Sequence, residues 1–168
     1  LYVRTGTSIR PATHGAGHER GLRPGTENTA YIVGLGQAAR LAALGLDENV
    51  ERLSSLRDRL WQGLFAGVGE RLRLNGPIDR RLPNTLNVGF PDVVGQDLLE
   101  RASSVCASTG AACHSGTTTL SATLAALGLA PEEARGTLRL SLGWQSSTDE
   151  VDRAIEELVG AWEALTHA

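Results

Sequence analysis

The sequence contains no lysine and no methionine, and all 16 of its basic residues are arginine. A chain without methionine has no initiator residue, so we expect the 168 residues to be a piece of a longer protein. Without lysine, the chain has no side-chain amine. Any chemistry that needs such an amine must take it from another stretch of polypeptide.

Other features that the sequence lacks exclude whole classes of function. No apolar run approaches the roughly 20 residues that span a bilayer, and the first residues lack the basic region and apolar stretch of a secretory signal. The net charge is only -3 and no basic cluster exceeds Arg80 and Arg81, which argues against nucleic acid and anionic membranes as partners. Two cysteines are too few for a disulfide framework. We therefore expect a cytoplasmic protein with free thiols.

The residues that are present have the patterning of a globular α/β protein. Hydrophobic residues make up 41% of the chain and charged residues 21%, as in ordinary soluble domains. Helical and alternating apolar patterns follow one another, which predicts helices packed against a small sheet. Ser147 and Glu150 form a capping-box pair that begins the last helix. The expected helices span residues 26–44, 47–64, 96–102, 120–127 and 148–165, and the expected strands span residues 72–74, 85–90, 105–107 and 137–142.

A glycine-rich loop over residues 14–28 is a candidate anion site. It combines flexible backbone N–H groups, two arginines and an expected helix start at Thr26, which together suit a phosphate group. The same composition is also typical of an exposed loop, because glycine-rich stretches alone are weak evidence for a site, so both interpretations stay open. A zinc site from His14 and His18 is disfavoured, because the intervening glycines oppose a helix and no further ligand has a suitable spacing.

The two cysteines have different surroundings. Cys113 lies on an expected loop of small residues, where a thiol can be exposed and reach a substrate. A thiolate is the nucleophilic form, so its use depends on neighbours that lower its pKa, and His114 is one candidate. Cys106 lies in an expected apolar strand, which predicts a small core residue.

Arg139 is the third residue of interest. Alternation over 137–142 places Leu138 and Leu140 on one face of a strand and Arg139 on the other. A guanidinium there can bind a carboxylate through two parallel hydrogen bonds, or it can simply be solvated. Taken alone, the residues indicate a loop thiol, a candidate phosphate loop and an outward arginine, but no function.

Four motifs occur in a fixed order that covers nearly the whole chain. Together they resemble the NifS-like cysteine desulfurases and the related selenocysteine lyases of the class V aminotransferase group. The motifs are HERGLRPGTEN at 18–28, LPNTLNVGF at 82–90, ASTGAACHSG at 107–116 and ALGLAPEEARGTLRLSLG at 126–143.

This resemblance implies a fold, a reaction and site residues. The fold would be the C-terminal small domain of a fold type I transferase that uses pyridoxal phosphate, with residues 1–45 ending the large domain and residues 46–168 forming the small one. The reaction would remove sulfur from L-cysteine, leaving alanine and an enzyme persulfide on Cys113. Arg139 would bind the substrate carboxylate, and Thr26 would reach the cofactor phosphate of the partner subunit in a homodimer. The resemblance also implies a sulfur-acceptor protein, such as an iron–sulfur scaffold, and no metal site.

Some features depart from the family or leave alternatives open. The family's cofactor lysine lies in the large domain, upstream of Leu1, so we expect the isolated chain to be inactive and not to bind the cofactor covalently. Residues 143–147 differ from the family's Gly-Arg-Phe-Thr-Thr, and residues 111–115 also resemble selenocysteine lyases, so the preference for sulfur or selenium stays open. A non-catalytic sulfur-relay module and a redox switch between the two cysteines are the remaining interpretations.

Overall fold

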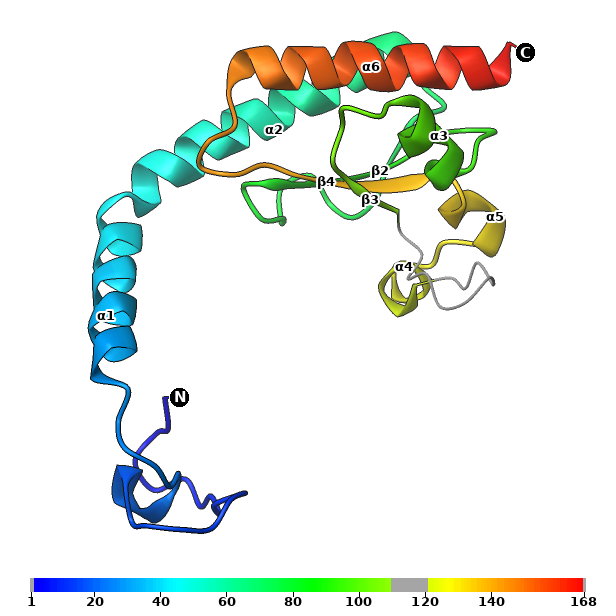
Figure 1. The fold of residues 1–168 in the computed structure, drawn as a ribbon. Coiled ribbons are helices and arrows are strands. Elements are labelled where there is room, and N and C mark those ends of the chain that lie inside the picture. Colours follow the sequence, from blue (N-terminus) through cyan, green and yellow to red (C-terminus); the bar gives the residue numbers. More distant parts are fainter. Residues whose placement is uncertain (1, 110–120, 168) are drawn as a thin grey trace. The chain divides into compact units, whose positions relative to one another are not determined.

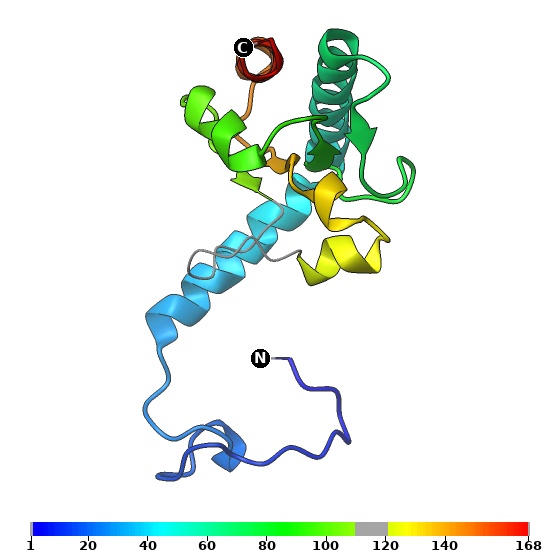
Figure 2. The same ribbon diagram turned by 90° about the vertical axis from the view of Figure 1, so that its right-hand side faces the viewer.

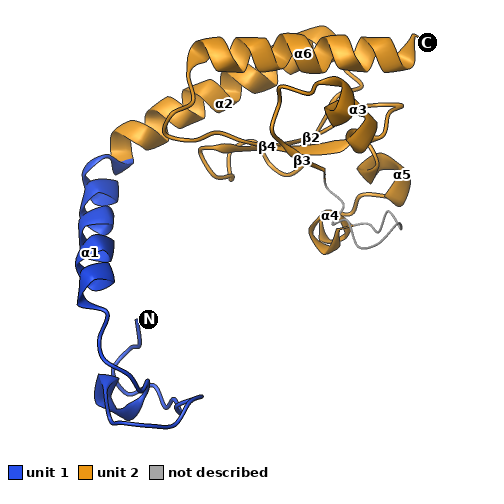
Figure 3. Cartoon of the chain, viewed as in Figure 1, with its two compact units in different colours: residues 1–46 blue, residues 47–168 orange. Residues whose placement is uncertain are grey.

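The structure is a computed structural model that describes residues 2–109 and 121–167. Cys113 therefore lies outside the described residues. The chain divides into two compact units, residues 1–46 and residues 47–168 (Figure 3). The assignment of residues 1–45 to a large domain and 46–168 to a small domain stays a prediction.

The first unit contains a turn-rich loop followed by one helix. The loop includes the short 3-10 helix η1 (Glu19–Gly21), and helix α1 spans Thr29–Leu44. The helix begins three residues later than Thr26, where we expected it, because the Asn28 side chain accepts a hydrogen bond from the Tyr31 N–H at 3.2 Å. Such a side-chain acceptor satisfies one of the free N–H groups of the first turn. No residue of α1 is buried.

The second unit is built on a four-stranded antiparallel sheet with strand order β1-β2-β4-β3. The strands are β1 (Arg73–Leu74), β2 (Thr85–Gly89), β3 (Ser108–Thr109) and β4 (Thr137–Ser141). The two central strands, β2 and β4, are distant in sequence but pair along their whole length. Period-two alternation places their leucine and valine side chains on one face and their polar side chains on the other.

Helices cover the apolar face of this sheet (Figures 1 and 2). They are α2 (Leu46–Val68), α3 (Gly95–Arg101) and α6 (Thr148–Thr166). Their apolar stripes and the inward side chains of β2 and β4 form one core, whose least exposed large side chains are Leu64, Val88, Leu98, Leu138 and Leu158. The predicted α/β class, with helices against a small sheet, is confirmed.

Helices α2 and α6 approach closely where glycine replaces a side chain. A Cβ atom on Gly67 would lie 2.6 Å from Cγ2 and 2.8 Å from Cγ1 of Val159. A Cβ on Gly63 would likewise overlap Ile155. These glycines let the two helices pack at a distance that alanine would not permit.

The short elements that follow β3 match the sequence patterns. Helix α4 spans Ala122–Ala126 and helix α5 spans Pro131–Ala134, with Gly128 between them at a φ of +80°. The capping box at the start of α6 is confirmed: Ser147 accepts from the Glu150 N–H, and the Glu150 carboxylate accepts from the Ser147 N–H at 2.9 Å.

The expected strand over 105–107 is wrong. The strand is β3, at Ser108–Thr109, because its edge position is set by pairing with Arg139 and Leu138 of β4. Among the described residues no single helix is long and apolar enough to cross a membrane, although α1 and α2 taken together meet the criteria of length and composition as a bent pair.

Candidate active site

Arg139 lies on the face of the sheet opposite the core, as predicted. It is exposed, whereas its neighbours Leu138 and Leu140 are buried. Its side chain borders a groove of about 610 Å³ between α3 and the β3 edge of the sheet. The other residues that line this groove are Gln96, Leu99, Glu100, Val105, Cys106, Ala107, Ser108 and Ser141.

The guanidinium of Arg139 has no anionic partner in the described part of the chain. Its one hydrogen bond there is a long one, from Nη2 to the Ser108 hydroxyl at 3.4 Å. All the salt bridges seen in residues 2–109 and 121–167 involve other arginines. An exposed arginine whose donors are almost unused can bind an incoming carboxylate.

Cys106 was expected to be a core residue, and this prediction is wrong. Its side chain is exposed and free, and it lines the same groove as Arg139. The reason is that residues 105–107 precede the strand instead of forming it, so their alternation does not turn Cys106 toward the core. Exposure was not visible in the sequence, where a short apolar run does not distinguish a strand from the segment that leads into it.

The loop that carries Thr26 is shaped by an arginine. Nη1 of Arg23 donates to the carbonyl oxygens of Gly25 at 2.8 Å and Pro24 at 3.2 Å, and Nη2 pairs with Glu19 at 3.4 Å. Arg23 therefore holds the turn together instead of offering a free guanidinium to a phosphate. Arg20, at a φ of +60°, makes no hydrogen bond with another described residue and is the arginine of the loop left for an anion.

The residues present do not make a complete pyridoxal phosphate site. The sequence has no lysine to form a covalent link with the cofactor. Thr26 is exposed, and its hydroxyl forms no hydrogen bond within the described residues. In this loop, Thr26 and Arg20 have side-chain donors that no described residue occupies.

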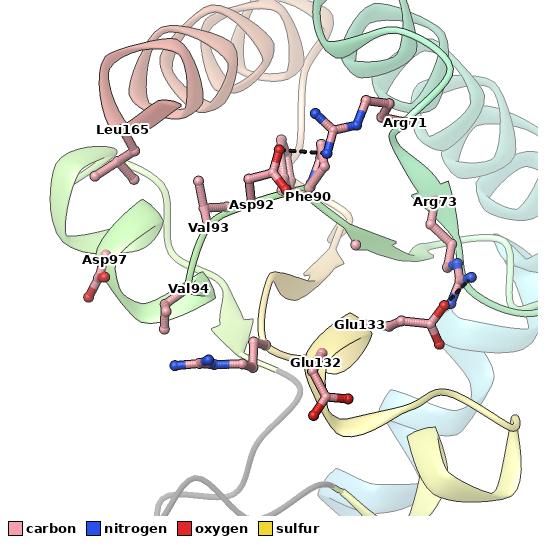
Figure 4. A pocket seen from close by; sticks show the side chains of 13 residues that line it. Arg71, Arg73, Phe90, Asp92, Val93, Val94, Asp97, Glu132, Glu133 and Leu165 are labelled. Atoms are coloured by element: carbon pink, nitrogen blue, oxygen red, sulfur yellow. Dashed lines mark ion pairs between the residues drawn. The ribbon is translucent and has the colours of Figure 1, made fainter. Parts of the chain in front are cut away.

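A second cavity, of about 750 Å³, lies away from these residues (Figure 4). Two ion pairs, Arg71 with Asp92 and Arg73 with Glu133, cross parts of its wall at 2.5 Å each. Hydrogen bonding to Arg73 holds the pKa of Glu133 below its usual value. Since these opposite charges already satisfy each other, the cavity is less suited to an anionic substrate than the groove beside Arg139.

No metal centre is found in the part of the chain that the structure describes. No group of three or more histidine, cysteine, aspartate or glutamate side chains gathers there.

Comparison with known proteins identifies the family. The model of the family described as "Aminotransferase class-V" matches residues 5–154, so this chain belongs to the class V aminotransferases. The predicted resemblance to NifS-like proteins is confirmed.

Individual relatives are cysteine desulfurases and NifS-like proteins. The chain is 44% identical to the cysteine desulfurase IscS of Clostridium botulinum, over 94% of this chain and 41% of that protein. It is 41% identical to a cysteine desulfurase of Nostoc, over 99% of this chain and 42% of that protein.

Solved structures that resemble this chain are also NifS-like proteins. A NifS-like protein superposes with a TM-score of 0.80 at 33% identity, covering 99% of this chain and 42% of the other. A NifS-like protein from Rickettsia africae gives a TM-score of 0.71 at 28% identity, covering 96% and 41%. The chain thus spans about two-fifths of the length of these relatives.

Proposed function

We propose that this chain is the part of a pyridoxal-phosphate-dependent cysteine desulfurase that binds the substrate carboxylate and receives its sulfur. The observation that supports this most is Arg139, an exposed arginine on a sheet face, beside a groove, with no carboxylate partner among the described residues. The family and the similarity to cysteine desulfurases supply the reaction class.

In the proposed reaction each residue of the chain has a separate task. Arg139 binds the carboxylate of L-cysteine and fixes its orientation. The thiolate of Cys113 attacks the substrate sulfur, so that a sulfur–sulfur bond forms and the carbon–sulfur bond breaks; the electron pair of the broken bond passes to the substrate carbon, which takes up a proton. The products are alanine and a Cys113 persulfide, which passes its outer sulfur to an acceptor protein such as an iron–sulfur scaffold. When bound, pyridoxal phosphate would withdraw electrons from the substrate, and its lysine must come from outside these residues.

The remaining parts of the proposal concern assembly and location. Thr26 and the loop around it would hold the cofactor phosphate of the partner subunit in a homodimer, and the protein works in the cytoplasm. Residues 1–45 and 46–168 belong to the large and small domains. Selenocysteine is the alternative substrate, because residues 111–115 resemble those of selenocysteine lyases.

The persulfide assignment can be tested by mass spectrometry on the protein from the complete reading frame. After incubation with L-cysteine and alkylation, the peptide with Cys113 should gain one sulfur atom, and alanine should appear. Cys113→Ser should lose both signals but keep the absorbance of the bound cofactor. Cys106→Ser is the matched control and should behave like the unchanged protein. Sulfur release by the Cys113→Ser variant at the unchanged rate would refute the assignment.

The role of Arg139 predicts a change in substrate binding. Hydrogen bonds to charged groups contribute about 1.5–3 kcal/mol, so Arg139→Ala should raise the KM for L-cysteine roughly 10- to 150-fold. Arg101→Ala is the control, because Arg101 is exposed at the end of α3 and forms no side-chain hydrogen bond with another described residue. Equal KM values for the two variants would make Arg139 a solvated residue without a role in binding.

An activity test on the isolated chain distinguishes the proposed enzyme from the alternative of a sulfur-relay module. With L-cysteine and pyridoxal phosphate it should form neither alanine nor persulfide, since it has no lysine. Turnover by the purified chain would contradict this. If the chain instead takes sulfur from a persulfide donor without any cofactor, the relay module becomes the better description.

A further inference from the structure

A row of three polar side chains crosses the open face of the sheet. Arg139 of β4 pairs in register with Asn87 of β2 on one side and with Ser108 of β3 on the other. Directly opposite residues in antiparallel strands point to the same face, with Cβ atoms about 4.5–5.5 Å apart. Asn87 and Ser108 are thus the immediate neighbours of Arg139 across the sheet.

The amide of Asn87 is held by a buried partner. Asn75, only 6% exposed, donates from Nδ2 to Oδ1 of Asn87 at 2.7 Å, and the Asn75 backbone N–H donates to the Asn87 carbonyl at 3.0 Å. Nδ2 of Asn75 also lies 3.5 Å from the hydroxyl of Thr137, which is fully buried. The Asn87 side chain is therefore anchored from the β1 side of the sheet, which is the side away from Arg139.

This anchoring leaves one buried atom unsatisfied. Oδ1 of Asn75 has no donor among the described residues. A buried acceptor without a donor costs roughly 1–3 kcal/mol, so an asparagine that is buried in this way calls for an explanation. The short hydrogen bond that Asn75 donates to the side-chain oxygen of Asn87 supplies such an explanation.

The side-chain oxygen of Asn87 already accepts a hydrogen bond from Asn75. The amide nitrogen Nδ2 is therefore the group of Asn87 that can bind another partner. No hydrogen bond from this nitrogen to another described residue exists. The row therefore offers an amide N–H donor on the strand beside Arg139, whose guanidinium makes one long hydrogen bond to Ser108 on the other side, and the described residues supply no anion to either. A planar carboxylate, with two oxygens and about four acceptor positions, suits this pair of donors.

We infer that Asn87 is a second carboxylate-binding residue beside Arg139, and that Asn75 is the positioning residue that turns its amide. The inference rests on the proposed function for the identity of the ligand, which is the carboxylate of an amino acid with a thiol. One oxygen of that carboxylate is bound by Arg139 and the other by Nδ2 of Asn87.

Nuclear magnetic resonance of the isotope-labelled chain tests this without any turnover. L-cysteine is titrated until the Arg139 Nε signal saturates, and cysteamine, which keeps the amine and thiol but lacks the carboxylate, is the control ligand. The Nδ2 signals of Asn87 should move together with the Arg139 signal for L-cysteine and stay in place for cysteamine. Movement of Arg139 alone would overturn the role of Asn87 and leave the proposed function standing. Movement of neither signal would overturn the inference, while the proposed function would still be decided by the KM of Arg139→Ala in the complete protein.

Variants separate a binding role from a structural one. Asn87→Asp keeps the oxygen that accepts from Asn75 but replaces the donor with a carboxylate beside Arg139. It should unfold at the same urea concentration as the unchanged chain, yet the Arg139 signal should no longer respond to L-cysteine. An Asn87→Asp chain that binds L-cysteine normally would refute the inference, because a purely structural Asn87 needs only the retained oxygen.

Asn75→Ala completes the series. The Asn87 shift caused by L-cysteine should fall at least several-fold, while the shift of Arg139 persists. An unchanged Asn87 response in a folded Asn75→Ala chain would show that Asn75 does not position the amide.

Discussion

Replacing Gly67 with alanine would test the close packing of α2 on α6. The new Cβ atom would meet both methyl groups of Val159, at 2.6 and 2.8 Å, and its Cβ atom at 3.3 Å. Valine is stiff at χ1 in a helix, so rotation does not remove the overlap. Overpacking of this kind costs about 1–3 kcal/mol, whereas glycine to alanine in a helix gains about 1 kcal/mol. We expect a net loss of up to about 2 kcal/mol in the free energy of unfolding.

Urea unfolding measures this loss, and the same helix pair provides the control. Gly160 lies within α6, and a Cβ atom there would meet nothing within 4 Å. Gly160→Ala should therefore stabilise the protein by up to about 1 kcal/mol, the full gain in helix propensity. In the double variant Gly67→Ala with Val159→Ala, the clash is relieved, so the two changes should not be additive. If Gly67→Ala stabilises as much as Gly160→Ala, the helices do not pack as described.

Two further predictions concern the last helix. Ser147→Ala removes the acceptor of the α6 capping box and should lower the free energy of unfolding by about 1 kcal/mol, as measured by urea unfolding; an unchanged midpoint would mean that the cap contributes nothing. Hydrogen bonds from Arg59 at 2.6 and 2.8 Å lower the pKa of Asp152 from its ordinary 3.8. Because the folded-state pKa is the lower one, this carboxylate stabilises the fold above pH 3.8, and the stabilisation is lost as the pH falls through the folded value. Acid unfolding of Asp152→Asn should therefore depend less steeply on pH than that of the original chain, and an equal dependence would mean that the pair with Arg59 does not stabilise the fold.

The elements with strong local signals were predicted well from the sequence. In the strand around Arg139, apolar and polar residues alternate clearly, and the last helix begins with the capping box of Ser147 and Glu150. Both elements could therefore be predicted without knowledge of their tertiary contacts. The strand expected over 105–107 failed because β3 is too short to have a period of its own, and its position depends on pairing with β4.

The candidate site was predictable only in part, for the same reason. The outward face of Arg139 followed from alternation. Asn87 gave no signal, because what distinguishes it is a hydrogen bond to Asn75 and a place opposite Arg139, 52 positions further along the chain. Contacts of this kind arise from strand pairing, which a pattern within one segment does not contain.

The pairing of β2 with β4 also has a consequence for how the chain can evolve. Between them the chain returns to the sheet once, as the edge strand β3, and the excursion from β3 back to β4 spans residues 110–136, which include position 113. The entropy lost when such an excursion closes grows only with the logarithm of its length, by about 0.6 kcal/mol for each doubling. Insertions near position 113 would therefore barely disturb the central strands, so the length of this connection can change while Arg139 keeps its register opposite Asn87.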